Sequence, residues 1–196
     1  MRGEPSRRTR VIVTIAVFAL LAVGLFFGVR ALIDVAAWQT ATAPSATPTP
    51  TSTAAGFVYT SDEFGYSIEF PAEPTEQSKT VPAGDAEIEV TSAAWDNGSA
   101  SLVSTGARYP AGELTDTTIS LKTALDGLVA NTPDAQLVGS DPFTLAGIPA
   151  VKAQINVPAG TLLVVIAIDG DVQYQLVAAN IAESAAEGFF STFTPA

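Results

Sequence analysis

The sequence lacks the two side chains that most often carry protein chemistry. None of its 196 residues is His and none is Cys. Histidine is the usual acid–base group near neutral pH and the commonest metal ligand, and cysteine is a frequent nucleophile and zinc ligand. The composition therefore excludes Ser–His and Cys–His nucleophiles, ordinary zinc sites, disulfides and a lipidated cysteine. A reaction would have to depend on carboxylates or hydroxyls.

Two pairs of acidic residues have a spacing that could do chemistry. Asp169 and Asp171 flank Gly170 and could contact Ca²⁺, but a calcium loop needs six to eight oxygens and no Glu follows at the usual spacing, so a hairpin turn is favoured. Glu87 and Glu89 share one face of an expected strand. They could form an acid–base pair if one were desolvated, and an exposed polar face is the favoured reading. We therefore expect no metal, no cofactor and no catalytic set.

A hydroxyl–amine pair and three aromatic residues complete the candidates. Ser78 and Lys79 are adjacent in sequence, whereas a Ser–Lys nucleophile is assembled in space. Trp95, Tyr109 and Tyr174 could line a ligand groove, because aromatic rings with a polar tip suit binding sites; simple core packing is the alternative.

An apolar stretch near the N-terminus predicts that the chain is inserted in a membrane. Residues 11–29 read VIVTIAVFALLAVGLFFGV without a charge, and a helix of that length nearly spans the roughly 30 Å of a bilayer core. Residues 1–10 hold four arginines and one glutamate. The positive-inside rule then leaves this N-terminus in the cytoplasm and carries the rest of the chain across the plasma membrane. We interpret residues 11–30 as a transmembrane signal anchor.

Two other readings of this segment stay open. Val35-Ala36-Ala37 offers small residues where a signal peptidase would cut, although the apolar run is longer than the typical 7–15 residues of a signal peptide. Ser6-Arg7-Arg8 weakly resembles a twin-arginine export signal, although Arg10 stands where that pattern has an apolar residue.

Residues 31–56 are expected to form a disordered linker. From position 40 to 55 the chain reads TATAPSATPTPTSTAA, in which proline prevents a regular helix and Thr, Ser and Ala cannot build a core. The linker would hold the domain away from the membrane as an extended tether, and its Thr–Pro richness also suits O-glycosylation.

Residues 57–196 have the patterns of one folded extracytoplasmic domain. Apolar alternation and turn residues predict a mainly antiparallel α+β sandwich with helices packed against a sheet. The strands are expected at 66–70, 87–95, 99–109, 136–145, 148–157, 161–168 and 172–179. Helices are expected at 115–131, capped by Asp116, and around 186–193. Residues 162–168 are apolar on both faces, which predicts a central strand covered on both sides.

The charge of this domain restricts its partners. Residues 57–196 carry four basic side chains, Lys79, Arg108, Lys122 and Lys152, against eighteen acidic ones. Such a surface repels phosphate backbones, so no nucleic-acid partner is expected. A cation-rich partner would be tolerated.

Four segments, in order, resemble the MOG1/PsbP-like domain family. They are residues 64–71 (FGYSIEFP), 143–150 (FTLAGIPA), 169–176 (DGDVQYQL) and 189–193 (FFSTF), and the resemblance covers residues 57–194. It implies an α/β/α sandwich with a twisted antiparallel sheet, and a proline- and acid-rich loop at residues 72–81. Family members are mostly accessory, binding or assembly factors without a shared catalytic set. Membrane-tethered versions with such a linker are typical of actinobacteria.

The sequence therefore predicts a single-pass membrane protein with a non-catalytic extracytoplasmic domain. It would bind or assemble envelope components, and its partner could be an envelope protein, a lipid or a cell-wall polymer. Two alternatives are a carboxylate-dependent hydrolase of the envelope and a purely structural surface domain.

Overall fold

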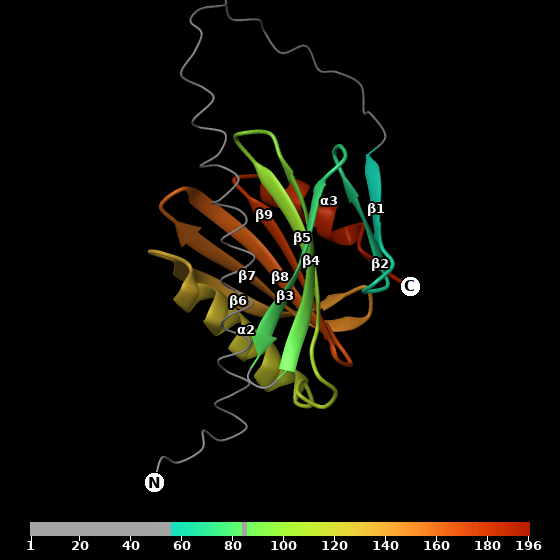
Figure 1. The fold of residues 1–196 in the computed structure, drawn as a ribbon. Coiled ribbons are helices and arrows are strands. Elements are labelled where there is room, and N and C mark those ends of the chain that lie inside the picture. The colour runs from blue at the N-terminus through green and yellow to red at the C-terminus, as the bar shows by residue number, and fades with distance from the viewer. Residues whose placement is uncertain (1–55, 84–85) are drawn as a thin grey trace, which may run out of the picture.

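A seven-stranded antiparallel sheet, called the main sheet below, forms the middle layer of the fold (Figure 1). The computed structural model describes residues 56–83 and 86–196. The strand order is β3-β4-β5-β9-β8-β7-β6. In chain order the strands are β3 (Thr75–Ala83), β4 (Ala86–Asp96), β5 (Ser101–Arg108), β6 (Gln136–Leu145), β7 (Ile148–Val157), β8 (Gly160–Asp169) and β9 (Val172–Ala179).

Two further layers cover the faces of the main sheet (Figure 1). Helix α2 (Thr117–Asn131) packs on one face. On the other face lie helix α3 (Glu183–Ser191) and a three-stranded small sheet of order β1-β2-β10. Its strands are β1 (Phe57–Ser61), β2 (Tyr66–Phe70) and β10 (Thr194–Pro195). The expected α+β sandwich with helices on opposite faces is confirmed, with the small sheet as an addition to the third layer.

The expectations for the first 55 residues lie outside the described residues. They concern the basic N-terminus 1–10, the transmembrane helix 11–30 and the linker 31–56, of which only Gly56 is described. Within 56–83 and 86–196, neither helix combines the length and the apolar character needed to cross a bilayer.

Strand alternation divides the interior into two cores. In β8, Val164 and Ile166 point into the core beneath α2, while Val165 and Ala167 point into the core beneath α3 and the small sheet. All four are at most 1% exposed. The prediction of a central strand buried on both sides is confirmed, because β8 lies between β7 and β9.

Local signals place the turns and the first helix as expected. The side chain of Asp116 accepts a hydrogen bond from the backbone nitrogen of Ile119 and caps α2. Ala146 and Gly147, with φ of 49° and 90°, make the two-residue turn between β6 and β7. A turn of this kind needs positive φ at both central residues, and its backbone twist matches that of the flanking strands.

The expectation of a loop at residues 72–81 is wrong. Residues Thr75–Ala83 form β3, which pairs with β4 over nine residues. The segment lacks the apolar alternation that marks a half-buried strand, because β3 lies at an edge and Val81 is its only large buried apolar residue among those described. Backbone hydrogen bonds to β4 define this strand. Such bonds do not depend on side-chain type, so they produce no recognisable residue pattern in β3.

Candidate functional site

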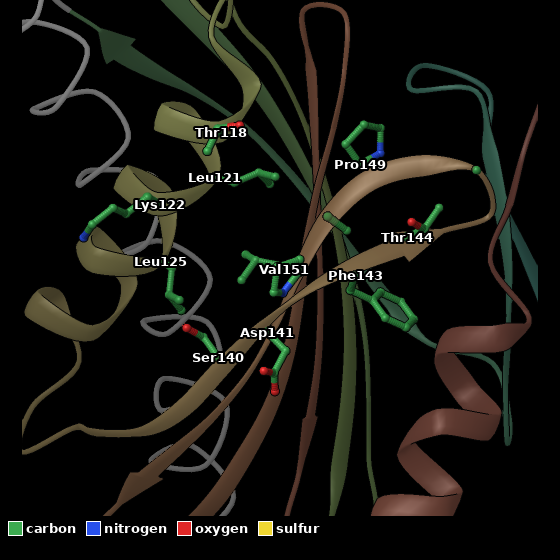
Figure 2. A pocket seen from close by; sticks show the side chains of 13 residues that line it. Thr118, Leu121, Lys122, Leu125, Ser140, Asp141, Phe143, Thr144, Pro149 and Val151 are labelled. Carbon is green, nitrogen blue, oxygen red and sulfur yellow. The ribbon is translucent and has the colours of Figure 1, made fainter.

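A groove lies between α2 and the β6–β7 hairpin in the described part of the chain (Figure 2). We call it the α2–β6 groove. It encloses a volume of about 510 Å³. Helix α2 contributes Thr118, Leu121, Lys122 and Leu125, and the strands contribute Asp141, Phe143 and Val151 among others. Its wall is therefore mostly apolar, with one cation and one carboxylate.

The pattern of α2 explains the apolar wall. Leu121, Leu125 and Leu128 are buried at helical spacing, as the sequence predicts, and hold the helix against β7 and β8. Thr118 and Lys122 occupy the helix face next to this stripe and are exposed. The helix covers the inner strands and leaves the space above β6 open, which makes the groove.

The β6–β7 hairpin forms the opposite wall. Phe143 on β6 is 36% exposed, so part of its ring is open to solvent. The Lys152 ammonium lies 6.0 Å from the centre of the Phe143 ring, a cation–π contact. Phe143 pairs with Ala150, which is buried on the α3 side, and its ring points away from α2, so Phe143 borders the groove only at the rim (Figure 2).

Charges around the groove are mostly paired. Lys122 forms an ion pair with Asp126 one helical turn away, and Lys152 pairs with Glu187 of α3 at 3.0 Å. Asp141 has no ion pair with any residue the structure describes. Because the lining is mostly apolar and its one cation, Lys122, already has a carboxylate partner, the groove suits an apolar side chain better than a small anion.

A second hollow lies on the other side of the same hairpin, next to α3. We call it the α3 hollow. It encloses about 350 Å³ and is lined by Phe143, Thr144, Lys152, Glu187 and Phe190 among others. Phe143 and Thr144 therefore border both hollows, although α2 and α3 pack on opposite faces of the main sheet.

The structure does not bring Trp95, Tyr109 and Tyr174 together. Tyr109 is buried in the core beneath α2, and Tyr174 is buried in the core beneath α3. Trp95 is half-buried at the margin of the second core. Burial raises the pKa of both tyrosines. The Tyr174 hydroxyl donates to the carbonyl oxygen of Phe64 at 2.9 Å. Their described contacts are those of core residues.

The two candidate carboxylate pairs lie apart on the main sheet: Glu87 and Glu89 are both on β4, and Asp169 and Asp171 flank Gly170 at the hairpin turn between β8 and β9. Glu89 on β4 and Asp169 on β8 fall in one row across the main sheet, through Arg108 and Val172. Three strand spacings separate their Cα atoms by roughly 14 Å. Pairs that work together on a glycosidic bond are at most about 9.5 Å apart. Within 56–83 and 86–196 no three Asp or Glu side chains cluster as a metal site would require.

Ser78 and Lys79 do not face each other. They are neighbours in β3, so their side chains point to opposite faces of the sheet. The Ser78 hydroxyl is 2.8 Å from the Thr91 hydroxyl on β4. Burial lowers the pKa of Lys79. The arrangement is that of an edge strand hydrogen-bonded to its neighbour.

The sequence interpretation missed the groove. Its residues come from an exposed helix face and an edge strand, and each is ordinary in isolation. The available signal was Phe143, the aromatic residue of this strand, directly after Pro142. The groove itself forms only because α2 packs beside β6, and the sequence does not reveal that packing.

No family model matches the chain, and no curated protein does. Among solved structures, the chain is similar to the solution structure of cyanobacterial PsbP (CyanoP) from Synechocystis sp. PCC 6803, with 12% identity and a TM-score of 0.48, over 79% of this chain and 100% of that one. It is also similar to PA94, a protein of unknown function from Pseudomonas aeruginosa, with 14% identity and a TM-score of 0.37, over 73% of this chain and 99% of that one.

These values are too low to transfer an activity or a partner to this chain. The architecture agrees with the sandwich that the MOG1/PsbP-like resemblance implies, and membership of that family stays a prediction.

Proposed function

We propose that this chain is a single-pass plasma-membrane protein whose domain, residues 57–196, lies outside the cytoplasm and binds a protein of the cell envelope. The binding is non-catalytic. The apolar run at 11–29 and the arginines before it support the anchor and its orientation. The linker 31–56 then gives the domain reach along the membrane surface.

The α2–β6 groove is the observation that carries the binding role. Exposed apolar surface at Phe143 borders a mostly apolar hollow of about 510 Å³. Clefts of this size with mostly apolar walls are where proteins usually bind their ligands. A protein side chain fits the site because the lining combines apolar walls with one carboxylate, Asp141, that has no ion pair among the described residues.

A photocrosslinking experiment in intact native cells tests the proposal. A benzophenone-bearing phenylalanine replaces Phe143 in the full-length chain, and in a matched strain it replaces Phe57. Phe57 is the best control because it is also a strand phenylalanine, with 39% exposure against 36%. We expect one discrete crosslinked product from position 143, identified by mass spectrometry as an envelope protein, and none of it from position 57.

The same strains test location. Protease added to spheroplasts should digest the domain and leave residues 1–10 protected. Equal products from both probe positions, a cytoplasmic protein as the crosslinked partner, or protection of the domain from external protease would each contradict the proposal.

A further inference from the structure

The two edges of the main sheet differ in character. The middle of β3 reads EQSKT, and two of its side chains are engaged: Glu76 accepts from the Tyr59 hydroxyl, and Ser78 bonds Thr91. Strand β6 is exposed at nine of its ten residues. Its apolar residues Leu137, Val138 and Phe143 are 42%, 56% and 36% exposed. Both strands are edges of the described main sheet, but the exposed side chains in the middle of β3 are polar, whereas β6 exposes three large apolar residues.

The backbone of β6 has a free side. In the part of the chain that the structure describes, β6 pairs with β7 and with no other strand. Its outward N–H and C=O groups can therefore accept a further strand, as sheet edges commonly do. Natural proteins usually blunt such an edge, and an edge of ten residues is long.

A hollow flanks this edge on each face of the sheet. The α2–β6 groove lies on one face and the α3 hollow on the other, and both border Phe143 and Thr144. Side chains of an extended strand point alternately to the two faces. A strand added beside residues 143–145 would therefore direct successive side chains toward the two hollows in turn.

We propose that β6 binds an extended segment of the partner protein as an eighth strand of the main sheet. Main-chain hydrogen bonds would supply affinity and the two hollows would select alternate side chains, as in other cases of strand addition. An apolar side chain enters the α2–β6 groove. This inference rests on the proposed function, since it specifies how the partner of that groove binds.

Charge defines the partner segment further. Lys122 and Lys152 are already paired with Asp126 and Glu187, whereas Asp141, in the middle of β6, has no ion pair among the described residues. The domain as a whole carries eighteen acidic and four basic side chains. A segment with lysine or arginine near its ends would neutralise Asp141 and be attracted by the field of the domain.

Strand β6 also carries features that keep an edge from pairing indiscriminately. Pro142 removes one main-chain donor, and the register of β6 on β7 shifts between Leu137 and Gly139. Pairing is thereby confined to the stretch next to the hollows, where side-chain fit decides which segment binds. The acidic charge of the domain opposes pairing with a second copy of the chain, because both copies carry the same excess of carboxylates.

A peptide-binding experiment on the purified full-length chain tests the proposal. The probes are three dye-labelled peptides with lysines at both ends and threonine alternating with valine, leucine or phenylalanine. Matched peptides carry the same side chains but N-methylated amides at adjacent central positions, which prevents them from pairing along either edge. Fluorescence anisotropy measures affinity, and hydrogen exchange measured by mass spectrometry reports protection of residues 136–145.

We expect at least one unmodified peptide to bind and to slow exchange in β6, and its N-methylated partner to bind at least about tenfold more weakly. Phe143→Ser should weaken binding by a similar factor, whereas Phe57→Ser, at a comparably exposed phenylalanine of β1, should leave it unchanged.

Three results would overturn strand addition. They are no binding by any of the three peptides at millimolar concentration, protection at β3 instead of β6, or slowed β6 exchange that grows with protein concentration alone, which indicates self-pairing. Equal binding of unmodified and N-methylated peptides, still lost in Phe143→Ser, would reject strand addition while leaving the proposed binding function of the groove intact.

Discussion

Three tyrosine hydroxyls form hydrogen bonds between the β1–β2 region and the main sheet. The Tyr66 hydroxyl lies 3.1 Å from that of Ser104 on β5, and both side chains are buried. The Tyr59 hydroxyl donates to Glu76, and the Tyr174 hydroxyl donates to the backbone of Phe64. Each bond joins a residue of the β1–β2 region to the main sheet. Burial raises the pKa of all three tyrosines.

This burial makes the stability of the fold sensitive to alkaline pH. A raised pKa in the folded state means that the fold favours the neutral tyrosine, so its contribution is complete below the unfolded pKa of about 10 and is lost as pH rises above it. The free energy of unfolding should therefore fall above about pH 10, by up to about 1.4 kcal/mol per pH unit for each such tyrosine. Urea unfolding at several pH values measures this slope.

Tyr66→Phe separates the contribution of one residue. At pH 7 it should lower the free energy of unfolding by about 1 kcal/mol, because the buried Ser104 hydroxyl loses its partner. Above about pH 10 its curve should fall less steeply than that of the unchanged protein. Parallel curves above pH 10 would show that Tyr66 does not titrate with unfolding.

At the scale of elements, one close approach fixes the β1–β2 hairpin on the main sheet. A Cβ atom added to Gly106 of β5 would lie 2.6 Å from Cγ of Phe64, which is 3% exposed. Arg108, also on β5, has its guanidinium carbon 5.9 Å from the centre of the same ring and donates to the Glu63 carbonyl at 2.9 Å. The Phe64 ring therefore occupies the space that a side chain at position 106 would need.

Gly106→Ala should destabilise the fold by about 1–3 kcal/mol, because the rigid inner atoms of a buried ring cannot move aside cheaply. Gly139→Ala is the matched control. It introduces the same methyl group into a strand of the same sheet, where nothing lies within 4 Å of the added Cβ atom. We expect this control to stay within about 0.5 kcal/mol. Thermal unfolding of both variants provides the test, and equal losses would contradict the packing described.

The elements that could be predicted from the sequence are those whose signal is local. Helix α2 has an apolar stripe and a capping Asp116, and the β6–β7 turn has Ala146 and Gly147. The central position of β8 follows from its unbroken apolar run. In each case short-range patterning and tertiary packing point to the same structure.

The elements that could not be predicted depend on distant partners. Strand β3 is held by β4, and the two-residue strand β10 exists only through its pairing with Ser67 and Tyr66 of β2. In β9 the alternating residues Gln173 and Gln175 suggest a solvent-exposed face, yet they are 1% and 2% exposed. Sequence periodicity reports polarity, whereas burial depends on what the fold places above each face.

At the scale of the whole molecule, acidity is the dominant electrostatic feature. The chain has a formal net charge of −11 at pH 7, and its described domain holds only four basic side chains. Mutual repulsion of like charges opposes the compact state, and salt screens it. The two ion pairs at the α2–β6 groove and the α3 hollow involve largely exposed carboxylates, and exposed pairs contribute little.

Raising sodium chloride from about 0.01 M to about 0.5 M should therefore increase the melting temperature by a few degrees, because the screening length shrinks from about 30 Å to a few ångströms. A neutral osmolyte series serves as the control for general solvent effects. A melting temperature that falls or stays constant with salt would mean that attractive ion pairs, and not repulsion, dominate the surface.

The position of β1 determines how the domain responds to a pull on the chain before Gly56. Strand β1 runs along the margin of the small sheet and, among the described residues, pairs with β2 alone, from Phe57 opposite Phe70 to Ser61 opposite Tyr66. Tension applied at Gly56 loads the Phe57–Phe70 rung first, so the rungs open in succession, as in a zipper, and not all together in shear. Mechanical yielding thus begins in the small sheet, far along the chain from β6, and the seven main strands can keep their register while the hairpin opens.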